Sequence, residues 1–308
     1  MKSISTTLLF FFSFLGISQE APELFLAEFI SNFPNVRDLA ISPNGNEMMF
    51  TAQSVMGNLS AIVISKKTNN SWSTPKVASF SGQFFDLEPF YSNDGLKLYF
   101  VSTRPLSNET LEPKDFDIWF VERHTLSDTW SEPINLGFPI NTEHGEFYPS
   151  IANNGNFYFT RDNPDLKTKD DIYVSEFKNG AYQTPVKLSH AINSDGYEYN
   201  AFIAPDESYL VFGSYNRKDG FGSGDLYISF KKDNHWTVAK NLGGIVNSDK
   251  MDYCPFVDTK TNTLYFTSKR DNTKINQEKP LTTEELVSEL NKADNGSSRL
   301  YRFLLKNY

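Results

Sequence analysis

Five acidic residues recur at the start of successive strand-like segments of this chain. They are Asp38, Glu88, Glu146, Glu198 and Asp252. Carboxylates that converge on one place repel each other, and a bound cation or a shared proton relieves the repulsion. The same side chains can instead accept hydrogen bonds from free backbone N–H groups of the preceding loop. Because a feature present in every unit is more often architectural than catalytic, we expect the second role to dominate.

A repeated unit positions these acids. In each unit the first strand ends in a turn, and spacings of 50, 60, 52 and 54 residues separate the turn starts Ser42, Ser92, Ala152, Ala204 and Asp258. Such a period is typical of propeller blades and other repeat arrays. Turns such as Asn154-Gly155 suit a hairpin, because Gly accepts a positive φ. The sequence therefore predicts an all-β fold, a β-propeller of four-stranded antiparallel blades.

The two ends of the chain predict how the propeller closes. The last unit has only three predicted strands, at 252–257, 263–267 and 300–305, whereas an unpaired segment stands at 22–29. Pairing the N-terminal strand with the C-terminal blade completes that blade and removes two exposed sheet edges. We therefore expect five blades, with six as the alternative if residues 19–37 contain further structure.

The last unit also carries a long insertion at 271–298 between its second and third strands. Thr282 and Glu285 have the spacing of a capping box, which predicts a short helix at 282–290. We interpret this helix as a patch on the propeller rim; the alternative is a lid or a partner-binding helix.

Composition and the N-terminus indicate the compartment. Residues 1–18 read as a cleaved signal peptide, because Lys2 precedes an apolar run at 8–15 and small residues follow it. That run is too short to span a membrane. We expect a periplasmic or secreted monomer, one propeller domain over 19–308, without a lipidation cysteine. The net charge of −9 argues against nucleic acid as a partner. Cys254 is the one cysteine, so an internal disulfide is excluded.

Several short motifs recur from unit to unit. They are W-x-x-P, N-L-G, I-N-[ST], E-x-x-P, D-G-x-x-L-Y-F and D-I-[YW], seen for example at Trp130–Pro133, Asn135–Gly137, Ile140–Thr142, Glu146–Pro149, Asp94–Phe100 and Asp117–Trp119. They resemble the TolB-like, WD40-like β-propeller repeats of exported bacterial proteins, over nearly the whole mature chain. The resemblance implies a role as a scaffold in cell-envelope complexes.

Two functions fit this architecture. Loops on a rigid scaffold usually carry binding, so the first is a module whose loop face binds a protein or an envelope glycan. Its expected ligand-binding residues are the five acids with His144 and His190. The alternative is a glycosidase-like enzyme, in which Asp38, Glu146 and Glu198 are the candidate acid and base residues. We lean towards a protein without catalytic activity and leave the question open.

Charged residues around the loops predict further contacts. An Arg after the second strand and an Asp before the third should pair at the base of one loop, as Arg104 with Asp117, Arg161 with Asp171 and Arg217 with Asp225. In the last unit Arg270 faces Arg299 instead, which leaves one Arg free.

Asp162, Asp165 and Asp170 crowd a single loop. They are weak Ca²⁺ candidates, because they lack the regular spacing of a calcium loop. We predict no cofactor, with Ca²⁺ as the alternative.

Overall fold

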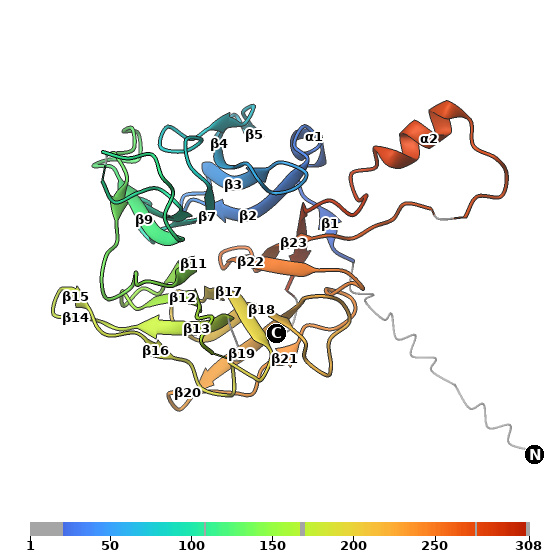
Figure 1. The fold of residues 1–308 in the computed structure, drawn as a ribbon. Helices are drawn as coiled ribbons and strands as arrows, with labels where there is room; N and C mark the ends of the chain where they lie inside the picture. Colours follow the sequence, from blue (N-terminus) through green and yellow to red (C-terminus); the bar gives the residue numbers. More distant parts are fainter. Residues whose placement is uncertain (1–20, 108, 167–169, 275, 306–308) are drawn as a thin grey trace, which may run out of the picture.

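Five antiparallel sheets, each built on four main strands, surround a central axis (Figure 1). The computed structural model describes residues 21–107, 109–166, 170–274 and 276–305. This arrangement confirms the predicted five-bladed β-propeller, and the six-bladed alternative is wrong. The predicted signal peptide lies outside the described residues.

Each blade has four strands, named here A to D from the axis outward. Blade 1 contains β2 (Asn35–Ile41), β3 (Glu47–Gln53), β4 (Ser60–Thr68) and β6 (Lys76–Val77). Blade 2 contains β7 (Asp86–Tyr91), β8 (Lys97–Ser102), β9 (Asp117–Glu122) and β10 (Ile134–Asn135). Blade 3 contains β11 (Gly145–Ile151), β12 (Phe157–Asp162), β13 (Asp170–Ser175) and β16 (Val186–Lys187). Blade 4 contains β17 (Tyr197–Ile203), β18 (Tyr209–Tyr215), β19 (Asp225–Lys232) and β21 (Lys240–Asn241). Blade 5 contains β22 (Asp252–Asp258), β23 (Thr263–Ser268), β24 (Arg299–Leu304) and β1 (Glu23–Leu24).

Short elements extend the outer edges of the blades. They are β5 (Ser71–Trp72), β20 (His235–Trp236) and the ribbon of β14 (Phe177–Lys178) with β15 (Ala181–Tyr182). The helix α1 (Ala27–Ile30) lies between the closing strand and blade 1.

The N-terminal strand β1 closes the ring as predicted. It pairs with β24, with Glu23 opposite Arg302 and Leu24 opposite Tyr301. The Arg302 guanidinium lies 2.9 Å from the Glu23 carboxylate, and the Phe25 ring packs edge-on against Tyr265 at 4.8 Å between centroids. The first and last segments of the described chain are thereby held in one sheet.

The core lies between the blades. Five clusters of buried apolar residues each draw their members from two neighbouring blades. Phe50, Phe100, Phe159, Phe212 and Phe266 occupy the same place in strand B of each blade, and all five are fully buried. The alternating aromatic pattern of strand B therefore holds neighbouring blades face to face.

Every innermost strand contains the same irregularity. The pairing register between strands A and B shifts in all five blades. One residue with a positive φ stands at the shift in each case: Asp38, Glu88, Tyr148, Asn200 or Cys254. A bulge changes which side chains face the axis. It therefore decides which acids reach the channel.

The insertion of blade 5 carries the helix α2 (Thr283–Leu290), which begins with a capping box between Thr282 and Glu285. Figure 1 shows α2 standing away from the blades at the end of its loop. Leu286 and Leu290 are exposed, so neither is part of the core. Within the described part of the chain, every helix is too short or too polar to cross a membrane.

Candidate functional site

One end of the propeller carries the D–A loops, which lead into the inner strands, and the B–C loops. We call this end the loop face. Four buried acids mark it, each at the start of an inner strand: Asp86, Glu146, Glu198 and Asp252. Each pairs with an Arg from the following B–C loop or strand end, at 2.8, 2.9, 2.9 and 3.5 Å for Arg104, Arg161, Arg217 and Arg270 respectively. We call these four contacts the tie pairs.

The acids of the tie pairs also bind their own D–A loops. Glu146 accepts hydrogen bonds from the backbone N–H of Thr142 at 3.1 Å and from its hydroxyl at 2.6 Å. Ser194 binds Glu198 in the same way, and Ser248 binds Asp252. Burial raises the pKa of Glu146 to about 7 despite these donors. These carboxylates stabilise the loops and are not accessible to a ligand.

The predicted Arg–Asp partners are wrong. Arg161 lies over the rings of Phe159 and Tyr173 at 5.2 and 5.0 Å, and this stacking directs its guanidinium inward to Glu146. The aspartates before strand C have other contacts: Asp117 binds Lys114 at 2.6 Å, Asp171 binds Lys187 at 2.6 Å, and Asp225 accepts the backbone N–H groups of Phe221 and Gly222. Likewise Arg270 pairs with Asp252 rather than facing Arg299.

The five acids predicted to be equivalent belong to two sets. Asp38 and Glu88 occupy the bulge, whereas Glu146, Glu198 and Asp252 stand two residues before it. Blade 2 supplies the tie-pair position with Asp86, which sequence reasoning missed. The signal was present in the spacing, because Glu88 lies four residues before its turn and Asp86 lies six, as Glu146 does.

Residues at the bulge converge on the channel axis, where Arg37 links them. Its guanidinium lies 2.7 Å from Asp38 and 2.8 Å from Glu88, and it donates to the thiol of Cys254 at 3.4 Å. Asn200 donates to Glu88 at 3.1 Å and accepts from Cys254 at 3.4 Å. We call these five residues the axis cluster.

The axis cluster combines charged side chains with low exposure to solvent. Burial and the neighbouring Asp38 carboxylate raise the pKa of Glu88 to about 7, although Arg37 opposes the shift. Oxygen atoms of Asp38 and Glu88 and the sulfur of Cys254 lie within 4.8 Å of one another. The Arg37 guanidinium contacts all three and already supplies the positive charge that a metal ion would bring. The cluster therefore links the inner strands at the channel axis through its own ion pairs and hydrogen bonds.

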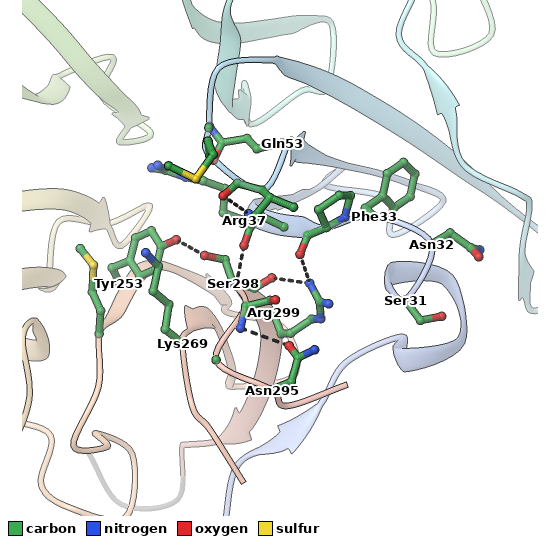
Figure 2. A pocket seen from close by; sticks show the side chains of 18 residues that line it. Ser31, Asn32, Phe33, Arg37, Gln53, Tyr253, Lys269, Asn295, Ser298 and Arg299 are labelled. Atoms are coloured by element: carbon green, nitrogen blue, oxygen red, sulfur yellow. Dashed lines mark hydrogen bonds between the residues drawn. The ribbon is translucent and has the colours of Figure 1, made fainter. Parts of the chain in front are cut away.

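Two adjoining cavities of the loop face meet at Arg37, Met251 and Tyr253. The smaller, of about 300 Å³, lies over the axis cluster and reaches Glu88, Asn200 and other residues of the inner strands. The larger, of about 870 Å³, lies between blades 1 and 5. Figure 2 shows Arg37, Lys269 and Arg299 among the side chains that surround the larger one, which we call the seam cleft.

The seam cleft lies where the tie-pair pattern is broken. In blade 1, Val36 occupies the tie-pair acid position, and Ser54 and Val55 follow strand B where the other blades supply an Arg. Arg299 comes instead from the start of β24 and donates to the backbone oxygen of Pro34 at 2.8 Å. The sequence predicted that one Arg of blade 5 would be free, and Arg299 is the one without a carboxylate among the described residues.

The remaining predicted site residues lie away from the two cavities or only at their edge. His144 is half-buried and His190 is exposed on D–A loops, and neither lines the seam cleft or the smaller cavity. Asp162 and Asp170 line the smaller cavity, whereas Asp165 is exposed on a loop that is only partly described. Calcium binding by these aspartates stays a prediction.

Comparison with known proteins identifies the class of fold. No family model matches the chain, and no curated protein matches its sequence. A solved structure of a putative TolB from Agrobacterium tumefaciens is 11% identical, with a TM-score of 0.50, and the match covers 88% of this chain and 90% of that one. A GH43 endo-arabinanase from Bacillus licheniformis is 14% identical, with a TM-score of 0.52 and coverage of 87% and 93%.

The chain therefore has a TolB-like β-propeller fold, and the fold of the endo-arabinanase is similar. At these identities the likeness concerns the fold alone.

Proposed function

We propose that this protein is a binding module that docks a segment of another protein on its loop face. The observation that carries the proposal is the apolar edge of the seam cleft, where Val55 is 74% exposed and Met56 is 80% exposed. Exposed apolar side chains that gather around a cavity are typical of a protein-binding surface.

Other B–C loops of the loop face also expose apolar side chains. Leu106 and Leu111 in blade 2 and Phe221 in blade 4 are all more than half exposed. Large exposed apolar side chains on several loops of one face favour a partner that spans the face over a small ligand held in one pocket. The resemblance to exported scaffold repeats supports the same role.

The glycosidase alternative has less support. Glu146 and Glu198 are fully buried and bound to Arg and to their own loops. Asp38 and Glu88 share Arg37, and less than 4% of either residue is exposed. A glycosidase needs one carboxylic acid and one carboxylate that both reach the sugar. We therefore assign these acids to the scaffold.

Displayed random peptides and a glycan array, offered in parallel to the purified protein, test the proposal. We expect peptides with apolar side chains to bind, and Val55→Glu to weaken binding about tenfold or more, since a charge is placed in an apolar contact. Val238→Glu is the matched control, because Val238 is 75% exposed on the outer part of blade 4. Absence of peptide binding, equal effects of the two variants, or selective glycan binding would overturn the proposal.

A further inference from the structure

The charged residues of the seam cleft are all cations, although the protein as a whole is acidic. The chain as a whole is acidic, with 38 Asp and Glu residues against 29 Lys and Arg. None of the 18 residues that line the seam cleft is acidic, whereas three of them, Arg37, Lys269 and Arg299, are cations. A cavity whose only charged lining residues are cations raises the local concentration of anionic groups.

Two of these three cations are not neutralised. Arg37 is balanced by Asp38 and Glu88. Lys269 is exposed, and its ammonium has no hydrogen-bond or ion-pair partner in the described part of the chain. Arg299 is only 6% exposed, and its guanidinium contacts backbone carbonyls but no described carboxylate.

The contacts of Arg299 fix its orientation. Nε donates to the carbonyl of Ala293 at 2.9 Å, and Nη1 donates to those of Pro34 and Ser298 at 2.8 and 3.0 Å. Nη2 has no partner among the described residues and belongs to a side chain that lines the cleft. Burial lowers the pKa of Arg299, as expected for a cation without a counterion. A buried, unpaired charge is costly, so a ligand anion that pairs with it gains affinity.

We propose that the seam cleft binds an acidic peptide segment, whose carboxylates pair with Arg299 and Lys269 while neighbouring apolar side chains contact Val55 and Met56. This inference rests on the proposed function and names the chemistry of the partner. A peptide fits better than a sugar acid because the cationic wall and the exposed apolar edge belong to the same cavity, of about 870 Å³.

Two short peptide libraries test the charge requirement. One mixes Leu and Met with Asp and Glu, and the other replaces the acids with Asn and Gln. We expect the acidic library to bind about tenfold more tightly, with an advantage that falls as NaCl is raised. Polygalacturonate and inorganic phosphate serve as anionic probes without apolar side chains. Equal binding of both libraries, or stronger binding of polygalacturonate, would overturn the inference.

Matched variants locate the charge. Lys269→Gln should weaken the binding of acidic peptides roughly two- to fivefold, because Lys269 is an exposed cation whose ion pairs are modest. Lys218→Gln, an exposed cation of the same face outside the cleft, should change nothing. Arg299→Lys keeps the charge but loses the oriented fork, and should weaken binding about tenfold. Should Arg299→Lys fail to fold, Lys269→Gln still decides, and equal effects of Lys269→Gln and Lys218→Gln contradict the inference.

The outcomes separate this inference from the proposed function. If neutral peptides bind as tightly as acidic ones and Val55→Glu still weakens their binding, the protein-binding function stands. The inference that the partner segment is acidic then fails. If no peptide of either library binds, both fail.

Discussion

The Arg217 guanidinium contacts the Glu198 carboxylate at 2.9 Å and also donates to the backbone carbonyl of Ile192 in the D–A loop. The same contact recurs in blades 2, 3 and 5 but not in blade 1, where Val36 replaces the acid. The tie pairs thus fasten the loop face in four blades. The seam cleft lies beside blade 1, the one blade in which no such pair is found among the described residues.

Breaking one tie pair should destabilise the fold. Glu198→Ala leaves Arg217 with a largely buried charge and is expected to cost about 3–5 kcal/mol in the free energy of unfolding, measured by urea denaturation. Adding Arg217→Ala removes that charge, so the double variant should be less destabilised than the sum of the single variants. Glu122→Ala, which removes a half-exposed ion pair with Lys97, should cost less than about 1 kcal/mol. Additive effects of the two buried substitutions would contradict this role.

The closing strand should make a large contribution to stability. Phe25 is 8% exposed and packs against Tyr265, so Phe25→Ala is expected to cost about 3–5 kcal/mol. Glu23→Ala removes only an exposed ion pair with Arg302 and should cost less than about 1 kcal/mol. Thermal and urea unfolding of both variants test the difference. Similar stabilities would show that closure does not depend on this packing.

Glu88 should make stability depend on pH. Its pKa is about 7 in the folded protein against 4.5 for the free group, so the folded state holds the proton more tightly. The contribution of Glu88 to the free energy of unfolding should then be greatest below pH 4.5 and should fall as pH rises towards 7. Glu88→Gln mimics the protonated group. Its stability relative to the parent should therefore rise between about pH 5 and 8, and parallel urea curves would refute the assignment.

Cys254 should be unreactive in the folded protein. It is 1% exposed, and burial raises the pKa of its thiol, so little thiolate is present and reagents have no access. We expect negligible reaction with a thiol-specific chromogenic disulfide at pH 8 and full reaction of one thiol after denaturation. Rapid reaction of the native protein would show that the axis cluster opens to solvent.

Sequence alone determined the architecture of this protein. Repeated turns such as Asn154-Gly155 and the alternating aromatic strands gave five blades, because hairpin chemistry and side-chain alternation are local properties. The missing fourth strand of the last unit predicted the pairing of β1 with β24, since an open sheet edge needs a partner. The sequence also predicted a free Arg in blade 5, but from a wrong pairing rule, because Arg270 binds Asp252 at the start of strand A.

Tertiary structure decided which charges meet. The bulge in each inner strand shifts its register, so Asp38 and Glu88 reach the axis whereas Glu146, Glu198 and Asp252 bind arginines at the rim. An ion pair depends on side-chain direction across several strands, and sequence neighbours such as Arg161 and Asp171 need not form one. Glu146, Glu198 and Asp252 hold their D–A loops in place, and the seam cleft, our proposed binding surface, lies where Val36 interrupts the tie-pair pattern.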